Sequence, residues 1–91
     1  MESQKQSLSS IHDPEYHRIV DALIYIREQA KISQKAIAQE IGLAQPDISK
    51  IERRERRIDI LETIRWVRAT GVDPVEFFAL IANSEVEHGS C

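Results

Sequence analysis

The chain has 91 residues, which suffice for one small domain, and 42% of them are hydrophobic while 30% are charged. Its apolar runs fall far short of the ~20 residues that span a bilayer, and residues 1–10 lack the basic and apolar regions of a signal peptide. We therefore expect a cytoplasmic protein rather than a membrane or secreted one. The lone cysteine, Cys91, cannot form an intramolecular disulfide and is expected to be a thiol in a frayed tail.

The formal net charge of −3 argues against a polyanionic partner until the distribution of charge is considered. Residues 31–57 carry seven basic and four acidic side chains, a net charge of +3. The flanks are acidic: residues 1–30 hold three basic and five acidic side chains, and residues 58–91 hold two and six. Local charge steers a polyanion more than total charge does, provided that the cations share one face. The middle of the chain is therefore a candidate surface for nucleic acid.

The chain begins with a polar, serine-rich segment, residues 1–12, which shows no hydrophobic period and is expected to be a flexible arm. Asp13 and Pro14 then predict the start of a helix, because aspartate caps a helix and proline suits its first position. Apolar residues recur at helical spacing from there to Gln29, so this segment predicts a helix with one face toward a core.

A second helix is predicted from Gln34 to Ile41, with Ser33 as its cap. Gly42 ends it, because glycine adopts the left-handed conformation that other residues avoid. Leu43 is expected to return to the core. A third helix is predicted to start near Gln45, since Pro46 is tolerated in a first turn that lacks intrahelical N–H partners.

A fourth helix is predicted from about Asp59 to just before Gly71. Trp66 within it is expected to lie in the core or on a half-buried surface rather than to form a stacking platform for nucleic acid. Four apolar side chains of this helix are expected to face the core: Ile60, Leu61, Ile64 and Val67.

A fifth helix is predicted from Asp73-Pro74 to about Asn83, with Glu76 at the capping-box position. Residues 84–91 are expected to form a flexible tail, so the folded domain should span residues 13–83. No run of alternating apolar residues is bounded by turn residues, and the predicted fold class is therefore all-α, a compact five-helix domain.

Two short helices joined by a tight glycine turn make a helix-turn-helix, in which the first helix crosses the DNA backbone and the second enters the major groove. The chain resembles the Xre family, which includes the lambdoid phage repressors, over about residues 23–82. The resemblance implies a helix-turn-helix domain of the phage repressor type that binds double-stranded DNA. It depends on a set of residues in register: Arg27, Ser33-Gln34, Ile37-Ala38, Ile41-Gly42-Leu43, Ile48-Ser49-Lys50-Ile51-Glu52 and Gly71-Val72-Asp73-Pro74.

The resemblance also implies roles for single residues. The recognition helix would span about residues 45–54, and a glutamine at its start can pair with an adenine edge. Arg27 and Glu52 match a structural salt bridge between the first and third helices. The matched base-contacting positions are Gln45, Pro46, Ser49 and Lys50, with Ser49 near either the backbone or a base edge.

Phosphate contacts are expected on both sides of the motif. Gln34 matches a glutamine that touches a phosphate, and Arg53 matches a residue just past the recognition helix that meets one. The arginine run that Arg53 opens would extend this contact, although Glu55 is expected to pair locally and to weaken the positive field. The phosphate-contacting set is Gln34, Arg53, Arg54, Arg56 and Arg57.

Two positions depart from the family pattern. Many relatives have glycine where this chain has Arg54, so either Arg54 is left-handed at a cost of ~1 kcal/mol or the third helix runs on. Pro46 has no N–H and offers only an apolar contact, such as one to a thymine methyl group.

The expected function is a sequence-specific DNA-binding transcriptional regulator, a repressor, that binds a two-fold operator as a homodimer. One such domain makes few base contacts, so a single copy would bind too weakly and too unselectively. The fifth helix has more large apolar residues than one inward stripe needs, which indicates a dimer contact there. The candidate interface residues are Phe77, Phe78 and Ile81.

Two other classes of function compete with this prediction. The chain could be an antitoxin-like module whose main target is a protein, with the acidic flanks facing a basic partner. An enzyme is disfavoured, because no phosphate-cradling glycine loop, activated nucleophile or paired acids can be found. The histidines lack metal-ligand spacing, and we expect no metal, cofactor or small-molecule ligand.

Overall fold

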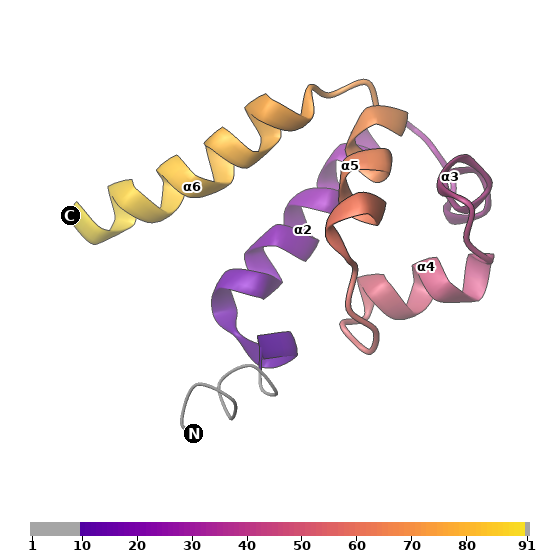
Figure 1. Cartoon of the computed structure of the whole chain (residues 1–91), viewed down its shortest axis with the longest axis horizontal. Helices are drawn as coiled ribbons and strands as arrows, with labels where there is room; N and C mark the ends of the chain where they lie inside the picture. The colour runs from indigo at the N-terminus through magenta and orange to yellow at the C-terminus, as the bar shows by residue number, and fades with distance from the viewer. Residues whose placement is uncertain (1–9, 91) are drawn as a thin grey trace.

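The computed structural model describes the backbone of residues 10–90 and the side chains of residues 11–83. Residues 1–9 of the expected arm, and Cys91, lie outside these ranges. Within residues 10–90 the chain forms helices and no strand, which confirms the all-α fold class (Figure 1). The elements are a short 3-10 helix η1 (Ser10–His12), α2 (Pro14–Gln29), α3 (Gln34–Ile41), α4 (Gln45–Glu52), α5 (Ile60–Ala69) and α6 (Pro74–Ser90).

Side-chain caps explain where the helices begin. Asp13 accepts a hydrogen bond from the N–H of Glu15 at 2.8 Å, and Ser33 accepts one from Ala36 at 3.0 Å. Asp59 accepts a hydrogen bond from the N–H of Glu62 at 2.7 Å. Each cap satisfies an N–H group that has no partner within its own helix, so the predicted starts of these helices are confirmed.

The core lies where α2, α3, α4 and α5 meet, and α6 closes one side of it. Trp66 of α5 is fully buried, and its indole Nε1 donates a 3.0 Å hydrogen bond to the carbonyl of Leu23 in α2. Burying each large apolar side chain contributes on the order of 1.5–3 kcal/mol. The buried apolar residues are Val20, Leu23, Ile37, Ala38, Ile41, Ile48, Ile51, Trp66, Val67 and Phe77.

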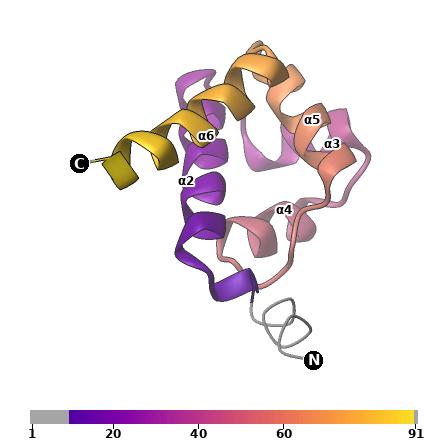
Figure 2. The same ribbon diagram turned by 60° about the vertical axis from the view of Figure 1, so that its left-hand side comes forward.

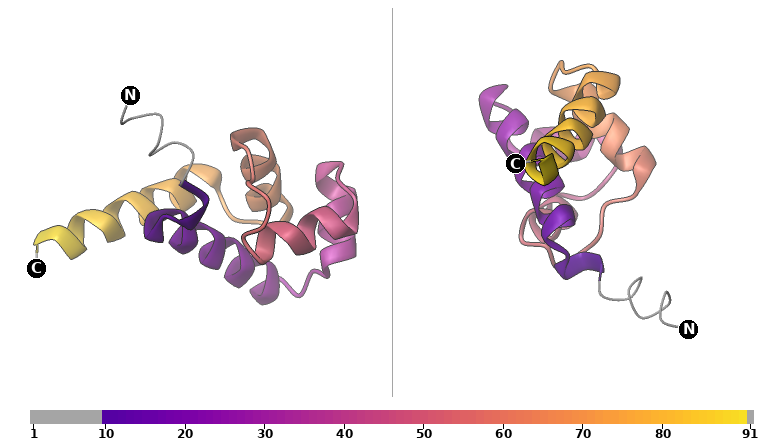
Figure 3. Two further views of the ribbon diagram at one scale, coloured as in Figure 1. Left: turned by 90° about the horizontal axis from the view of Figure 1, so that it is seen from below. Right: turned by 90° about the vertical axis from the view of Figure 1, so that its left-hand side faces the viewer.

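The helix-turn-helix and α6 lie at opposite ends of the molecule. α3 packs on both α4 and α5, while α6 contacts α5 and passes beside α2 (Figure 2). Seen from below, the C-terminal half of α6 projects away from the α3–α4 end (Figure 3, left). The surface formed by α3 and α4 is therefore free of α6, which leaves two separate faces for contact with other molecules.

Three expectations differ from the structure. Residues 10–12 belong to η1 rather than to a flexible arm, and His17 Nε2 lies 3.1 Å from the carbonyl of Ile11. α6 extends to Ser90, so the helix continues through most of the expected tail. In α5, Ile60 and Leu61 are exposed and were wrongly assigned to the core, because Thr63 and Trp66 occupy the inward positions together with Val67.

Candidate nucleic-acid interface

The corner between α3 and α4 is a tight turn that ends α3 at Ile41 and lets α4 begin at Gln45. Gly42 has a φ of 82°, and the N–H groups of Gly42 and Leu43 both donate to the carbonyl of Ala38 at 2.9 Å. Leu43 packs against the core, which anchors the turn as expected. At the start of α4, Asp47 Oδ2 lies 3.4 Å from the N–H of Ala44. The negative carboxylate of Asp47 also interacts favourably with the positive N-terminal end of the α4 dipole.

One face of α4 is buried and the other is open to a partner. Ile48 and Ile51 are fully buried and hold the helix on the core. Gln45, Pro46 and Lys50 are exposed, and Ser49 is half-buried. These four positions follow one another at helical spacing, so they share the outward side of α4. The predicted base-contacting residues thus lie on one open face of a helix that has the size for a major groove.

A chain of polar contacts connects the interior to this open face. Arg27 Nε lies 2.6 Å from Glu52 Oε2, and Arg27 Nη2 lies 3.1 Å from Glu52 Oε1. Gln34 Nε2 donates to the same Oε1 of Glu52 at 2.9 Å, and Gln45 Nε2 donates to Gln34 Oε1 at 2.8 Å. Arg27 also donates to the carbonyl of Ile32 at 2.7 Å. The network therefore connects α2, α3 and both ends of α4.

The expected salt bridge between Arg27 and Glu52 is thus present and largely buried, with side chains 12% and 10% exposed. A bidentate guanidinium–carboxylate pair has a fixed geometry. The side-chain amide of Gln34 donates a third hydrogen bond to the Glu52 carboxylate. Gln34 is held by Glu52 on one side and in turn holds Gln45 on the other. Its contact with phosphate stays a prediction, but its amide is already oriented on the open face.

Arg53 lies at the end of α4 and contacts the two side chains nearest to it. Its Nε lies 3.1 Å from Glu55 Oε2, its Nη2 lies 3.2 Å from Glu55 Oε1, and its Nη1 lies 2.5 Å from Ser49 Oγ. Hydrogen bonds from Arg53 and its charge hold the pKa of the Glu55 carboxyl below its ordinary value, with a smaller contribution from Lys50. The same hydrogen bonds raise the pKa of Arg53.

Arg54 takes the left-handed conformation, with a φ of 63°, so α4 does not run on past this residue. The N–H of Arg54 donates to the carbonyl of Ile51 at 3.0 Å, and the N–H of Glu55 donates to that of Lys50 at 2.8 Å. This pair of bonds is the Schellman ending that usually places glycine at the turn. The Arg54 side chain pairs with Asp21 of α2.

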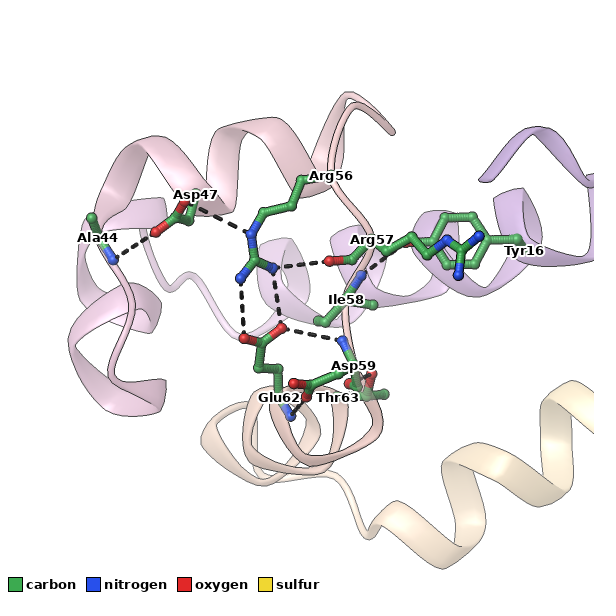
Figure 4. Close-up of polar contacts among 9 residues, drawn as sticks. All are labelled: Tyr16, Ala44, Asp47, Arg56, Arg57, Ile58, Asp59, Glu62 and Thr63. Carbon is green, nitrogen blue, oxygen red and sulfur yellow. Dashed lines mark hydrogen bonds and ion pairs between the residues drawn. The ribbon is translucent and has the colours of Figure 1, made fainter. Parts of the chain in front are cut away.

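The Arg56 side chain lies against the protein surface, where it pairs with acidic residues of two helices (Figure 4). Its Nη1 and Nη2 lie 3.1 and 3.2 Å from the two carboxylate oxygens of Glu62, and its Nε lies 3.8 Å from Asp47. A hydrogen bond from Arg56, opposed by burial, holds the pKa of Glu62 below its ordinary value. Arg56 therefore joins the loop to α4 and α5. Of the four arginines in the run, only Arg53 and Arg57 are exposed.

An open hollow of about 690 Å³ lies between the first turns of α3 and α4. Lys35 and Gln39 line it, although neither was singled out from the sequence. The available indication was their spacing, because residues four positions apart, such as Lys35 and Gln39, lie on one face of a helix. The complete lining is Ser33, Gln34, Lys35, Ala38, Gln39, Leu43 and Gln45.

Comparison with known proteins agrees with this geometry. The sequence matches the helix-turn-helix family model over residues 23–77, which is more than half of the chain. A solved structure named XRE-family like protein, from Pseudomonas syringae pv. tomato str. DC3000, is similar with a TM-score of 0.76. The two sequences are 32% identical, and the similarity covers 87% of this chain and 96% of that one. The chain belongs to the Xre family. No protein with a curated function matches it.

Membership of the Xre family makes α3 and α4 the two helices of a DNA-binding helix-turn-helix. None of the helices formed by residues 10–90 has the length and apolar character needed to cross a membrane. The described side chains also include no cluster of three or more His, Cys, Asp or Glu residues placed to hold a metal ion.

A second surface of this Xre-family chain lies on α6. Phe77 is 4% exposed and closes the core, whereas Phe78 is half-buried beside it, with ring centroids 5.6 Å apart in an edge-to-face arrangement. Leu80 is 68% exposed, so it does not share the inward face of Phe77. A hollow of about 400 Å³ between α2 and α6 is lined by Arg18, Asp21, Ala22, Leu80 and Ile81.

Proposed function

We propose that this Xre-family chain is a sequence-specific transcriptional regulator, of the repressor type, that acts in the cytoplasm as a homodimer on a two-fold operator. The observation that supports this most directly is the contact between Gln34 and Gln45. It holds an amide at the start of α4 in a fixed position on the open face. A preorganised amide loses less conformational freedom when it binds a base edge, so it discriminates between bases more sharply.

The proposal divides the interface into reading and holding contacts. Gln45, Pro46, Ser49 and Lys50 would face base edges in the major groove. Gln34 and the arginines that follow α4 would meet the phosphates on either side of it. Arg53 and Arg57 are the exposed members of that arginine set, whereas Arg54 and Arg56 would first have to leave their acidic partners. Two such helices must be about 34 Å apart to enter successive major grooves on one side of the DNA. A two-fold contact through α6 would set that separation.

Binding should depend steeply on salt. About two to four cationic contacts per protomer imply roughly four to eight per dimer and a slope of log K against log salt of about −4 to −7. The test is to select the bound sequence from a random duplex pool and to titrate it between about 50 and 200 mM salt. An unrelated duplex serves as the control. A flat response, or no enrichment of any sequence, would contradict the proposal.

Two alanine variants should separate reading from holding. Gln45→Ala should weaken binding to the selected operator by about 1–3 kcal/mol and have much less effect on an operator changed at the contacted base pair. Arg53→Ala should weaken every sequence by a similar factor, because a phosphate contact carries no sequence information. Equal losses on all sequences for Gln45→Ala would instead make Gln45 a backbone contact.

A further inference from the structure

Glu55 is an acidic residue placed among the cations that follow the recognition helix. Both of its carboxylate oxygens face Arg53, at 3.1 and 3.2 Å, and the charge of Lys50 also acts on it. Both partners are solvent-exposed, the Arg53 side chain by 54% and that of Glu55 by 56%. A negative group therefore lies on the surface that the proposed function assigns to DNA phosphate.

The backbone explains why Glu55 lies there. Because Arg54 is left-handed, the chain turns back on itself, and the N–H of Glu55 reaches the carbonyl of Lys50 at 2.8 Å. The turn places Glu55 at the end of α4, beside both Lys50 and Arg53. The pairing of Arg54 with Asp21 holds the same turn against α2. The position of Glu55 is thus part of the fold and does not depend on a long flexible loop.

We propose that Glu55 is an internal competitor of DNA phosphate for the guanidinium of Arg53. This inference rests on the proposed function. The Nε and Nη2 edge of an arginine binds a carboxylate and a phosphate in the same bidentate manner, so the two anions compete for one edge. The third nitrogen, Nη1, lies 2.5 Å from Ser49 Oγ. A phosphate must therefore displace Glu55 from Arg53 or accept its negative charge nearby.

Such competition lowers the affinity for every DNA sequence by a similar factor, because the guanidinium of Arg53 contacts a DNA phosphate and not a base. Gln45 and Pro46, the base-reading residues at the other end of α4, do not contact Glu55, and the charge of Lys50 acts on its carboxyl less than Arg53 does. The expected consequence is shorter occupation of unrelated DNA, while the discrimination between sequences is unchanged. An acidic residue at this position thus tunes the strength of binding separately from its specificity.

The test is the variant Glu55→Gln, which keeps the size of the side chain and removes its charge. At low salt it should bind both the selected operator and an unrelated duplex about three- to tenfold more tightly than the parent. The slope of log K against log salt should steepen by about 0.9 per protomer, since one uncompensated cation is added at each contact. The matched control is Glu76→Gln on α6, which changes the net charge equally and should leave affinity within about 1.5-fold.

A double variant decides whether Arg53 is the group that is competed for. In an Arg53→Gln background, the gain from Glu55→Gln should fall to less than half of its value in the parent. A gain that persists there would show a general field effect and overturn the assignment to Arg53. Unchanged affinity and slope in Glu55→Gln would overturn the competitor role while leaving the proposed function intact. A parent that bound no DNA at all would overturn both.

Discussion

Replacing Glu52 with alanine is expected to lower the free energy of unfolding by about 3–5 kcal/mol. The reason is that Arg27, whose side chain is only 12% exposed, would lose both hydrogen bonds to its carboxylate partner and remain charged. An uncompensated charge in a largely buried position costs far more than an exposed pair contributes. Thermal and denaturant unfolding, with and without operator DNA, measure the loss directly.

Glu28→Ala is the matched control for this variant. Glu28 also approaches Arg27, at 4.0 Å, but its side chain is 64% exposed. Its removal should change the free energy of unfolding by no more than about 1 kcal/mol. If Glu52→Ala melted like the parent and yet failed to bind DNA, the role of Glu52 would lie in the complex with DNA and not in the fold. A loss in both variants would mean that Arg27 requires both partners.

Phe78→Asp is expected to give a folded monomer whose operator binding is weaker by on the order of 100-fold or more. Phe77 is buried in the core and Phe78 packs only partly against it, so the exposed part of Phe78 and its exposed neighbour Leu80 are available for a second copy of the chain. A buried aspartate would be unpaired in such an interface and would prevent it from forming. Without the dimer, the two half-sites are bound independently and the benefit of linked binding is lost.

Sedimentation at tens of micromolar, without DNA, measures the assembly of the parent and its variants. Leu80→Asp is a second variant that leaves the core intact, because this side chain is 68% exposed. Ile60→Asp is the control, since Ile60 is an exposed apolar residue at the end of α5 remote from the connection to α6. A parent that sediments as a clean monomer would mean that DNA drives dimerisation or that α6 serves a protein partner, as in the antitoxin-like alternative.

The helix starts were predictable because each is encoded by neighbouring residues. Asp13-Pro14, Ser33 and Asp59 act on N–H groups two or three positions away, so no distant part of the chain is needed to recognise them. Gly42 ends α3 for an equally local reason. The orientation of α4 was predictable in the same measure, because its outward face follows from the spacing of Ile48 and Ile51 on its buried side.

The features that the sequence did not decide have a common cause, which is that distant contacts select among local possibilities. α5 has apolar residues on more than one side, and its orientation is decided by Trp66, whose indole finds the carbonyl of Leu23 on another helix. Arg56 belongs to a run that appears solvated, but Glu62 and Asp47 hold it from two helices. The resemblance left open whether Arg54 is left-handed. In the structure the Arg54 side chain pairs with Asp21, which lies 33 positions away in the sequence, and such a distant contact is not visible in the neighbouring residues.

The indole of Trp66 gives the protein its own optical reporter. It is the single tryptophan of the chain, it is fully buried, and its N–H is bonded to a backbone carbonyl. All tryptophan emission therefore comes from one buried site between α2 and α5, and it should shift to longer wavelength when unfolding exposes that site to water. Dissociation of a contact on α6 that leaves the core closed would not expose the indole. Intrinsic fluorescence can thus distinguish a variant that has lost its partner from one that has lost its fold.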